Sequence, residues 1–279
     1  MFIIIESGST KADWVTINRK DDFNFFVTDG VNPATQKELL DLSNYADLLK
    51  HIMEAEHIFF YGAGINDAVS TQRITDWFRS YGFEGKISVA EDLIAAARAC
   101  FGDGTGIVCI LGTGSNSCVY ENGKVLDCVP TLGYIFNDEG GGTQIGKEVL
   151  KAYFCKTMPE SERNIFEANY PITKEEVVEK VYRTSGANKY VASFAPFLMM
   201  IKGEWKDTLL DKVFTEFIEL RIMRYENFRN LPIKFVGSIA FYHKVYLEKA
   251  MNRHGLKIDE IVQKPIHKLI EYHLNHKFI

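Results

Sequence analysis

Short apolar runs bounded by turn residues alternate with longer stretches of helical periodicity along the first third of the chain. Short apolar runs of this kind predict β-strands, and apolar positions that recur every three to four residues predict amphipathic helices. We therefore expect a first series of elements in the order βββαβαβα. The expected strands cover residues 2–6, 13–18, 24–28, 57–61 and 86–90, and the expected helices cover 35–52, 66–81 and 92–101.

The same order begins again near Gly106, with additional helices inserted in its middle. The expected strands cover 107–111, 116–121, 124–128, 233–236 and 256–262, and helical sequence covers 143–228, 239–254 and 266–276. A repeated βββαβαβα unit predicts two α/β domains, because each unit can form its own covered sheet. The expected domains are residues 1–105 and 106–261, with a terminal helix in 262–279 that packs back on the first domain.

Composition narrows the class of protein further. A length of 279 residues with 46% hydrophobic side chains can bury two cores of ordinary size. The net charge of −5 is spread along the chain and gives no reason to expect nucleic-acid or membrane binding. No basic leader precedes the first strand, and five cysteines without a CxxC pair are typical of reduced, buried thiols. We therefore expect a cytoplasmic protein with a small-molecule partner.

Two turns rich in glycine and hydroxyl residues occupy equivalent places in the two units. Glycine lets the backbone approach a phosphate closely, and consecutive amide groups then form an anion cradle. Either turn alone reads as an ordinary tight hairpin, but the pair indicates a nucleotide polyphosphate held by one hairpin from each unit. The predicted phosphate-binding residues are Gly8, Ser9, Thr10, Lys11, Gly112, Thr113, Gly114 and Ser115.

Asp92 lies between an apolar strand and the helix that follows it. That place corresponds to the carboxyl end of a strand, where open α/β sheets bind their ligands. A carboxylate there can accept the proton of a hydroxyl nucleophile during phosphoryl transfer. The alternative is a helix N-cap, for which Asp is a favoured residue. The neighbouring Glu91 is the weaker candidate for a general base.

Four segments together resemble the N-acetylglucosamine kinases and the related BadF/BadG-type activator ATPases of the sugar kinase, hexokinase and actin superfamily. They are residues 6–13, 111–116, 137–141 and 235–240, in the order that the family has them. The resemblance implies a two-lobed actin-like ATPase fold, which is ribonuclease H-like, with a central cleft. It also implies a kinase of carbohydrate metabolism that uses ATP and Mg²⁺. The implied substrate is an amino sugar, with N-acetylglucosamine as the first candidate, and a hydroxyl of that sugar is phosphorylated.

The resemblance also implies roles for single residues. Asp92 would take the proton of the sugar hydroxyl, the 6-hydroxyl by analogy, and lobe closure would exclude water. Gly237 and Ser238 would lie beside the adenosine. The implied metal-binding residues are Glu6 and Asp138, and the implied sugar-binding residues are Asn32, Asp92, Thr113 and Asp138. For Asn32, a turn residue before proline is the alternative reading.

Three positions depart from the family pattern. Glu6 stands where many members of the superfamily have Asp, although some N-acetylglucosamine kinases share the Glu. Asn137 stands where relatives have Gly, and Leu132 where the sugar kinases have an aromatic residue. These departures leave open which sugar is phosphorylated.

Two other functions fit parts of the same pattern. An activator ATPase would need cysteines for an iron–sulfur cluster, and a non-catalytic sugar sensor would bind ligand without turnover. The oligomeric state is open, with a homodimer among the possibilities. We interpret the Walker-like segment 141–147 as a coincidence at a helix start, His273 and His276 as core or surface histidines, and Arg221, Arg224 and Arg229 as a solvated helix face.

Overall fold

The computed structural model describes residues 1–19 and 22–276, and the chain divides into two compact units. Unit 1 comprises Met1–Gly104, Glu121–Lys124 and Lys264–Ile279, of which 277–279 lie outside the described residues. Unit 2 comprises Thr105–Tyr120 and Val125–Gln263. The last segment of the chain therefore belongs to the same unit as the first.

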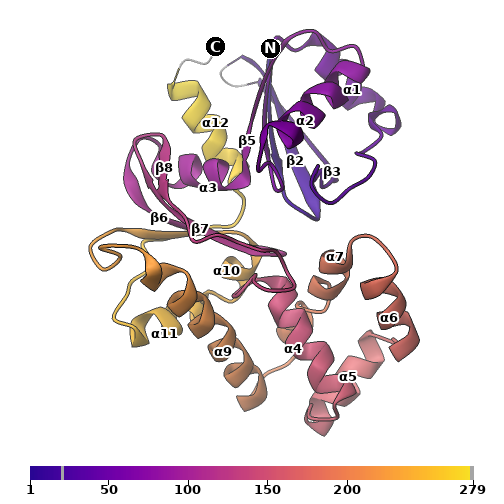
Figure 1. Cartoon of the computed structure of the whole chain (residues 1–279), viewed down its shortest axis with the longest axis vertical. Helices are drawn as coiled ribbons and strands as arrows, with labels where there is room; N and C mark the ends of the chain where they lie inside the picture. Colours follow the sequence, from indigo (N-terminus) through magenta and orange to yellow (C-terminus); the bar gives the residue numbers. More distant parts are fainter. Residues whose placement is uncertain (20–21, 277–279) are drawn as a thin grey trace. The chain divides into compact units, whose positions relative to one another are not determined.

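Unit 1 is built on a five-stranded sheet with the order β3-β2-β1-β4-β5 (Figure 1). The strands are β1 (Phe2–Ser7), β2 (Lys11–Arg19), β3 (Asp22–Asp29), β4 (His57–Gly62) and β5 (Lys86–Glu91). Strand β1 pairs antiparallel with β2 and parallel with β4, and β4 pairs parallel with β5. The carboxyl ends of β1, β4 and β5 consequently meet at one edge of the sheet.

Alternation of side chains along β1 gives this sheet two apolar faces. Ile3 and Ile5 pack with buried residues of α1 (Ala46–Glu54) and α2 (Ala68–Ser80). Phe2 and Ile4 pack on the other face with residues of α3 (Asp92–Phe101) and α12 (Ile266–Asn275). Helix α12 comes from the end of the chain and completes the cover of the second face.

The expected helix over 35–52 is wrong in its first half. Residues 35–41 form no helix. The helical residues of this range begin with the short η1 (Leu42–Asn44) and continue with α1 from Ala46. The Asn32 side chain accepts a hydrogen bond from the Ala34 amide, and the Gln36 side chain donates to the Gly30 carbonyl and accepts from the Asn32 amide. Side chains that bond the backbone in this way compete with helical hydrogen bonds, so the segment stays irregular.

Unit 2 repeats the strand order of unit 1. Its sheet has the order β10-β9-β6-β7-β8, with β6 parallel to β9 and β9 parallel to β10. The strands are β6 (Thr105–Leu111), β7 (Ser115–Glu121), β8 (Lys124–Asp127), β9 (Ile233–Val236) and β10 (Glu260–Val262). The predicted duplication is confirmed, although β10 is shorter than the expected strand over 256–262.

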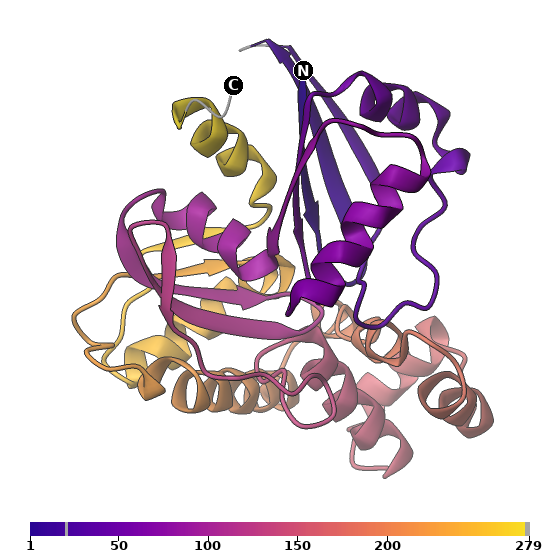
Figure 2. The same cartoon turned by 45° about the horizontal axis from the view of Figure 1, so that its top comes forward.

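The helices of unit 2 pack into one large core with β6 and β9. Helices α9 and α11, orange to yellow in Figure 2, run beside the strands of this sheet. The helices are α4 (Gly142–Phe154), α5 (Glu160–Asn169), α6 (Lys174–Tyr182), α7 (Ala187–Ala192), α8 (Phe197–Met200), α9 (Glu204–Leu220), η2 (Ile222–Arg224), α10 (Ser238–Tyr242) and α11 (Lys244–Arg253). The expected helix over 239–254 is thus divided at His243.

The cysteines differ from the expectation in part. Cys100, Cys109 and Cys118 are buried, whereas Cys128 and Cys155 are exposed. Within residues 1–19 and 22–276, no helix combines the length and the apolar character needed to cross a membrane.

Candidate active site

In unit 1 the carboxyl end of β1 contacts the segment that follows β3. The Ser7 hydroxyl accepts a hydrogen bond from the Val31 amide at 2.8 Å and donates to the Val31 carbonyl at 3.0 Å. The first hairpin begins at Gly8, whose amide donates to the Lys11 carbonyl at 3.0 Å. The expected phosphate hairpin and the segment before Asn32 therefore lie at the same edge of the sheet.

Asn32 is buried at this edge. Its Oδ1 accepts the Ala34 amide at 3.0 Å, so the side chain does have the turn function that sequence reasoning gave as the alternative. A Cβ added to Gly64 would lie 2.2 Å from Asn32 Oδ1, which shows how closely the loop after β4 approaches this amide. A cavity of about 240 Å³, lined in part by Pro33, Gly64 and Arg73, adjoins it.

Glu6 lies directly opposite Asp13 in the β1–β2 pairing. Burial and the nearby Asp13 and Asp92 carboxylates raise the pKa of Glu6 to about 7, while Lys11 and Lys264 act in the other direction. Asp13 is buried and contacts both ammonium groups, Lys11 Nζ at 2.9 Å and Lys264 Nζ at 3.6 Å. Three carboxylates thus concentrate negative charge beside the first hairpin.

Sequence reasoning missed Asp13 and Lys264. Asp13 could have been found by pairing the two arms of the hairpin, because that register places it opposite Glu6. No such local signal exists for Lys264, which reaches Asp13 from the segment that precedes α12.

Carboxylate oxygens are ligands that Mg²⁺ prefers, and the ion commonly takes one or two of them together with water and substrate phosphates. Glu6 fits such a role because its carboxylate lies near those of Asp13 and Asp92. The described residues contain no group of three or more His, Cys, Asp or Glu side chains arranged as a complete metal cage. The donor set therefore suits a magnesium ion that is largely hydrated or held by phosphates.

Asp92 is the first residue of α3, immediately after β5. The N-cap of that helix is Glu91, and no side-chain cap hydrogen bond is formed there. The alternative reading of Asp92 as an N-cap is therefore wrong. Asp92 is half-buried and its charge acts on Glu6, whereas the Glu91 side chain is exposed.

In unit 2 the second hairpin is bonded to the start of α4. The Gly142 amide donates to the Gly112 carbonyl and the Thr143 amide to the Thr113 carbonyl, both at 2.8 Å. Lys147 Nζ donates to the Tyr134 carbonyl at 2.8 Å. Since the first amides of α4 are already used, the Walker-like spacing of this segment is coincidental, as the sequence predicted.

The turn at Gly237 lies directly against the same hairpin. A Cβ added to Gly237 would come within 2.4 Å of the Leu111 carbonyl oxygen, and the φ of Gly237 is +115°. Both features require glycine. Ser238 follows as the first residue of α10, so the two residues expected at the adenosine side adjoin the phosphate hairpin.

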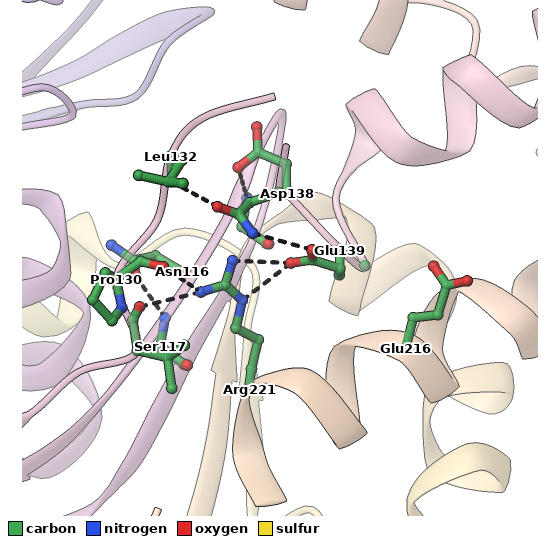
Figure 3. A network of polar contacts seen from close by, with 12 residues as sticks. Asn116, Ser117, Pro130, Leu132, Asp138, Glu139, Glu216 and Arg221 are labelled. Atoms are coloured by element: carbon green, nitrogen blue, oxygen red, sulfur yellow. Dashed lines mark hydrogen bonds and ion pairs between the residues drawn. The ribbon is translucent and has the colours of Figure 1, made fainter. Parts of the chain in front are cut away.

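The acidic loop (residues 128–141, between β8 and α4) holds Asp138 against the hairpin (Figure 3). Asp138 Oδ1 accepts the Ser115 amide at 3.1 Å, and a Cβ added to Gly114 would lie 2.7 Å from the same oxygen. Burial raises the pKa of Asp138, with smaller opposing contributions from the Ser115 amide, Lys147 and Arg221. The carboxylate is thus fixed beside the second hairpin by a backbone contact.

Glu139 forms a buried ion pair with Arg221, which corrects the expectation that Arg221 is solvated. The Arg221 side chain is 1% exposed, and its Nη2 lies 2.9 Å from Glu139 Oε2. Arg224 and Arg229 are exposed, as expected, but the expected helix face is wrong, because α9 ends at Leu220, Arg224 ends the short η2 and Arg229 lies in a turn. Helical periodicity could not distinguish the three, because only the tertiary contact with the acidic loop buries Arg221.

One of the two family departures in this loop has a structural role. Asn137 Oδ1 accepts the Leu132 amide at 2.7 Å, so the residue that replaces glycine ties the loop together. Leu132 is 71% exposed, and the aromatic Phe136 in the same loop is 74% exposed. The loop therefore carries an aromatic side chain, but at another position than the family pattern predicts.

The predicted site residues fall into two groups. Unit 1 brings together the first hairpin, Glu6, Asn32 and Asp92 at the carboxyl edge of its sheet. Unit 2 brings together the second hairpin, Gly237 and Asp138.

Comparison with known proteins gives several relatives. A crystal structure from Porphyromonas gingivalis, solved under a provisional assignment as an N-acetylglucosamine kinase, is 33% identical over 99% of both chains, with a TM-score of 0.89. The N-acetylmuramic acid/N-acetylglucosamine kinase of Clostridium acetobutylicum is 27% identical over 62% of this chain, and the match spans 61% of that enzyme's length. No family model matches the chain.

A more distant likeness concerns the fold alone. The structure of MreB 5 of Spiroplasma citri bound to AMPPNP matches 99% of this chain with a TM-score of 0.55 and 10% identity. The chain therefore shares the fold of MreB 5, and the predicted two-lobed actin-like fold is confirmed.

Proposed function

The chain belongs to the N-acetylglucosamine kinase-like family of phosphotransferases, and from that premise we propose that it transfers the γ-phosphate of ATP to a hydroxyl of an amino sugar. The observation that carries the proposal is the place of Asp92. It begins α3 at the carboxyl edge of the unit 1 sheet, does not serve as the helix N-cap, and acts on Glu6 at the mouth of the first hairpin.

In the proposed reaction, a sugar hydroxyl oxygen forms a bond to the γ-phosphorus as the bond to the ADP oxygen breaks. Asp92 accepts the proton that the hydroxyl loses. In this proposal, Gly8–Lys11 and Gly112–Ser115 bind phosphate oxygens chiefly through side-chain hydroxyl groups, because the Gly8, Gly112 and Ser115 amides already donate within the protein. Mg²⁺, when bound at Glu6 or Asp138, would neutralise phosphate charge.

N-acetylglucosamine is the acceptor that we propose first, with N-acetylmuramic acid as its closest competitor. The clostridial relative is named for both sugars. Asn32, Thr113 and Asp138 are the proposed sugar-binding residues, and the amide and carboxylate side chains among them suit hydroxyl and acetamido groups.

The test is ADP release with MgATP across a panel of sugars, comparing the native chain with Asp92→Asn. We expect release only with an N-acetylated hexosamine, and a fall in kcat of roughly 10²–10⁴-fold in the variant, since it lacks the base. Glu91→Gln is the matched control, because it removes an adjacent but exposed carboxylate and should keep nearly full activity.

Other outcomes would contradict the proposal in distinct ways. Hydrolysis of ATP without any sugar would favour an activator ATPase. Sugar binding without ADP release would favour a sensor. Equal losses in Asp92→Asn and Glu91→Gln would show that the base lies elsewhere.

A further inference from the structure

One side chain bonds both ends of the acidic loop. Arg221 follows α9 and donates from Nε and Nη2 to Glu139 Oε2, at 3.1 and 2.9 Å. Its Nη1 donates to the carbonyls of Val129 and Pro130, at 3.1 and 3.0 Å. The guanidinium thereby holds the beginning and the end of the loop in one place (Figure 3).

Stability alone does not account for this arrangement. Moving a charged pair out of water is costly, and apolar residues of similar volume often serve stability equally well or better. What a planar guanidinium adds is geometry, because its donors have fixed directions. Here those directions match acceptors at two places that are about ten residues apart in sequence.

The residue beside Glu139 is Asp138, whose backbone has little freedom. Its φ is +69°, a left-handed conformation that is unfavourable for a non-glycine residue and persists only where the surroundings impose it. Asn137 Nδ2 donates to Glu139 Oε1 at 3.3 Å, so both oxygens of Glu139 are engaged. The Asp138 carboxylate then meets the Ser115 amide at 3.1 Å.

We propose that Arg221 is the positioning residue for Asp138: by holding Glu139, Val129 and Pro130, it fixes the acidic loop so that the Asp138 carboxylate stays directed for acceptor binding. This inference rests on the proposed function, in which Asp138 binds the acceptor sugar. Arg221 itself would touch neither sugar nor nucleotide.

The first experiment uses Arg221→Lys, which keeps the charge but loses the planar fork. We expect faster hydrogen exchange at the Ser115 amide and across residues 129–139, together with at least tenfold weaker calorimetric binding of N-acetylglucosamine. The KM for MgATP should rise by a smaller factor than the sugar affinity falls. Ser115 and Asp138 are also proposed to hold phosphate and Mg²⁺, whereas the Gly112–Gly142 and Thr113–Thr143 bonds do not involve Arg221. The control variant is Arg224→Met, which changes an exposed arginine three residues away and should leave loop exchange and sugar binding unchanged.

A second variant guards against misfolding of the first. Glu139→Gln keeps the size of the side chain and an acceptor oxygen but removes the charge that faces Arg221. It should reproduce the change in loop exchange and in sugar binding to a lesser extent. Unchanged exchange in both variants would overturn the proposal.

A double-mutant cycle then tests whether Arg221 acts through Asp138. In the Asp138→Asn background, Arg221→Lys should weaken sugar binding less than twofold further. Equal losses in the two backgrounds would overturn the proposal. If the native chain binds no sugar but Arg221→Lys still frees the Ser115 amide, the proposed function fails while the positioning of Asp138 stands.

Discussion

At the scale of single residues, the acidic side chains near the two hairpins are held by different chemical groups. Asp13 contacts two ammonium groups and Glu139 a guanidinium, so their charges are neutralised by ion pairs. Asp138 is held by a backbone amide, and Glu6 lies among other carboxylates. The raised pKa values of Glu6 and Asp138 are typical of functional sites.

Gly237 allows the most specific residue-scale prediction. In Gly237→Ala the new methyl group would collide with the Leu111 carbonyl and would also demand a positive φ. We expect the second hairpin to move, with ATP binding weakened at least tenfold and unfolding made easier by roughly 1–3 kcal/mol. Nucleotide calorimetry and urea unfolding measure the two effects.

Gly186→Ala is a control that separates the effect of backbone strain from the effect of a steric collision. Gly186 also has a positive φ, of +81°, but a Cβ there would meet nothing within 4 Å. The Gly186→Ala variant should lose about 1 kcal/mol of stability and should bind nucleotide as tightly as the native chain. If both variants bound ATP normally, the turn at Gly237 would have no part in the nucleotide site.

At the scale of elements, α12 is the helix whose contribution is most easily measured. Leu269 is fully buried between α12 and the sheet of unit 1. Leu269→Ala should lower the free energy of unfolding by about 2–5 kcal/mol, because it leaves a cavity in a packed core. Tryptophan fluorescence during urea unfolding reports this, since Trp14 and Trp77 lie in unit 1. Glu271→Ala, exposed on the same helix, should change stability by less than about 0.5 kcal/mol.

Elements with a regular apolar pattern were predictable from sequence. The alternation in β1 and the spacing in α2 and α3 leave few other readings, and the repeated strand order followed from them. The helix over 35–52 failed because Asn32 and Gln36 bond the backbone locally.

The site was predictable only where function depends on local sequence. The two glycine-rich hairpins and the acidic loop could be recognised, and Asp92 could be placed after its strand. Arg221 and Lys264 could not, because each reaches its partner from a segment far along the chain, and sequence periodicity carries no information on such contacts.

At the scale of the whole molecule, two titratable side chains, Glu6 and His273, give the stability opposite dependences on pH. The pKa of Glu6 is raised from 4.5 to about 7, so the folded protein binds more protons than the unfolded chain between these pH values. The free energy of unfolding therefore falls as the pH rises through that range. Burial lowers the pKa of His273 from 6.5 to about 3, so stability present above pH 6.5 is lost as the pH falls toward 3.

Glu6→Gln should isolate the first of these contributions. In magnesium-free buffer above pH 7, the variant should be more stable than the native chain by about 2–3 kcal/mol, because a neutral amide cannot acquire the unfavourable charge. The difference should vanish below pH 4.5. Chemical unfolding across a pH series measures it, with the exposed Glu84→Gln as control. A constant difference at all pH values would mean that Glu6 does not titrate in this way.

The return of the chain to unit 1 also affects how the protein is made. The face of the unit 1 sheet that carries Phe2 and Ile4 needs Ile266, Leu269 and Ile270 of α12 for part of its cover. A ribosome synthesises those residues only after it has completed all of unit 2. One face of the unit 1 sheet therefore stays partly uncovered during nearly the whole of translation. Chaperones that recognise exposed apolar surface on nascent chains would be able to bind this face.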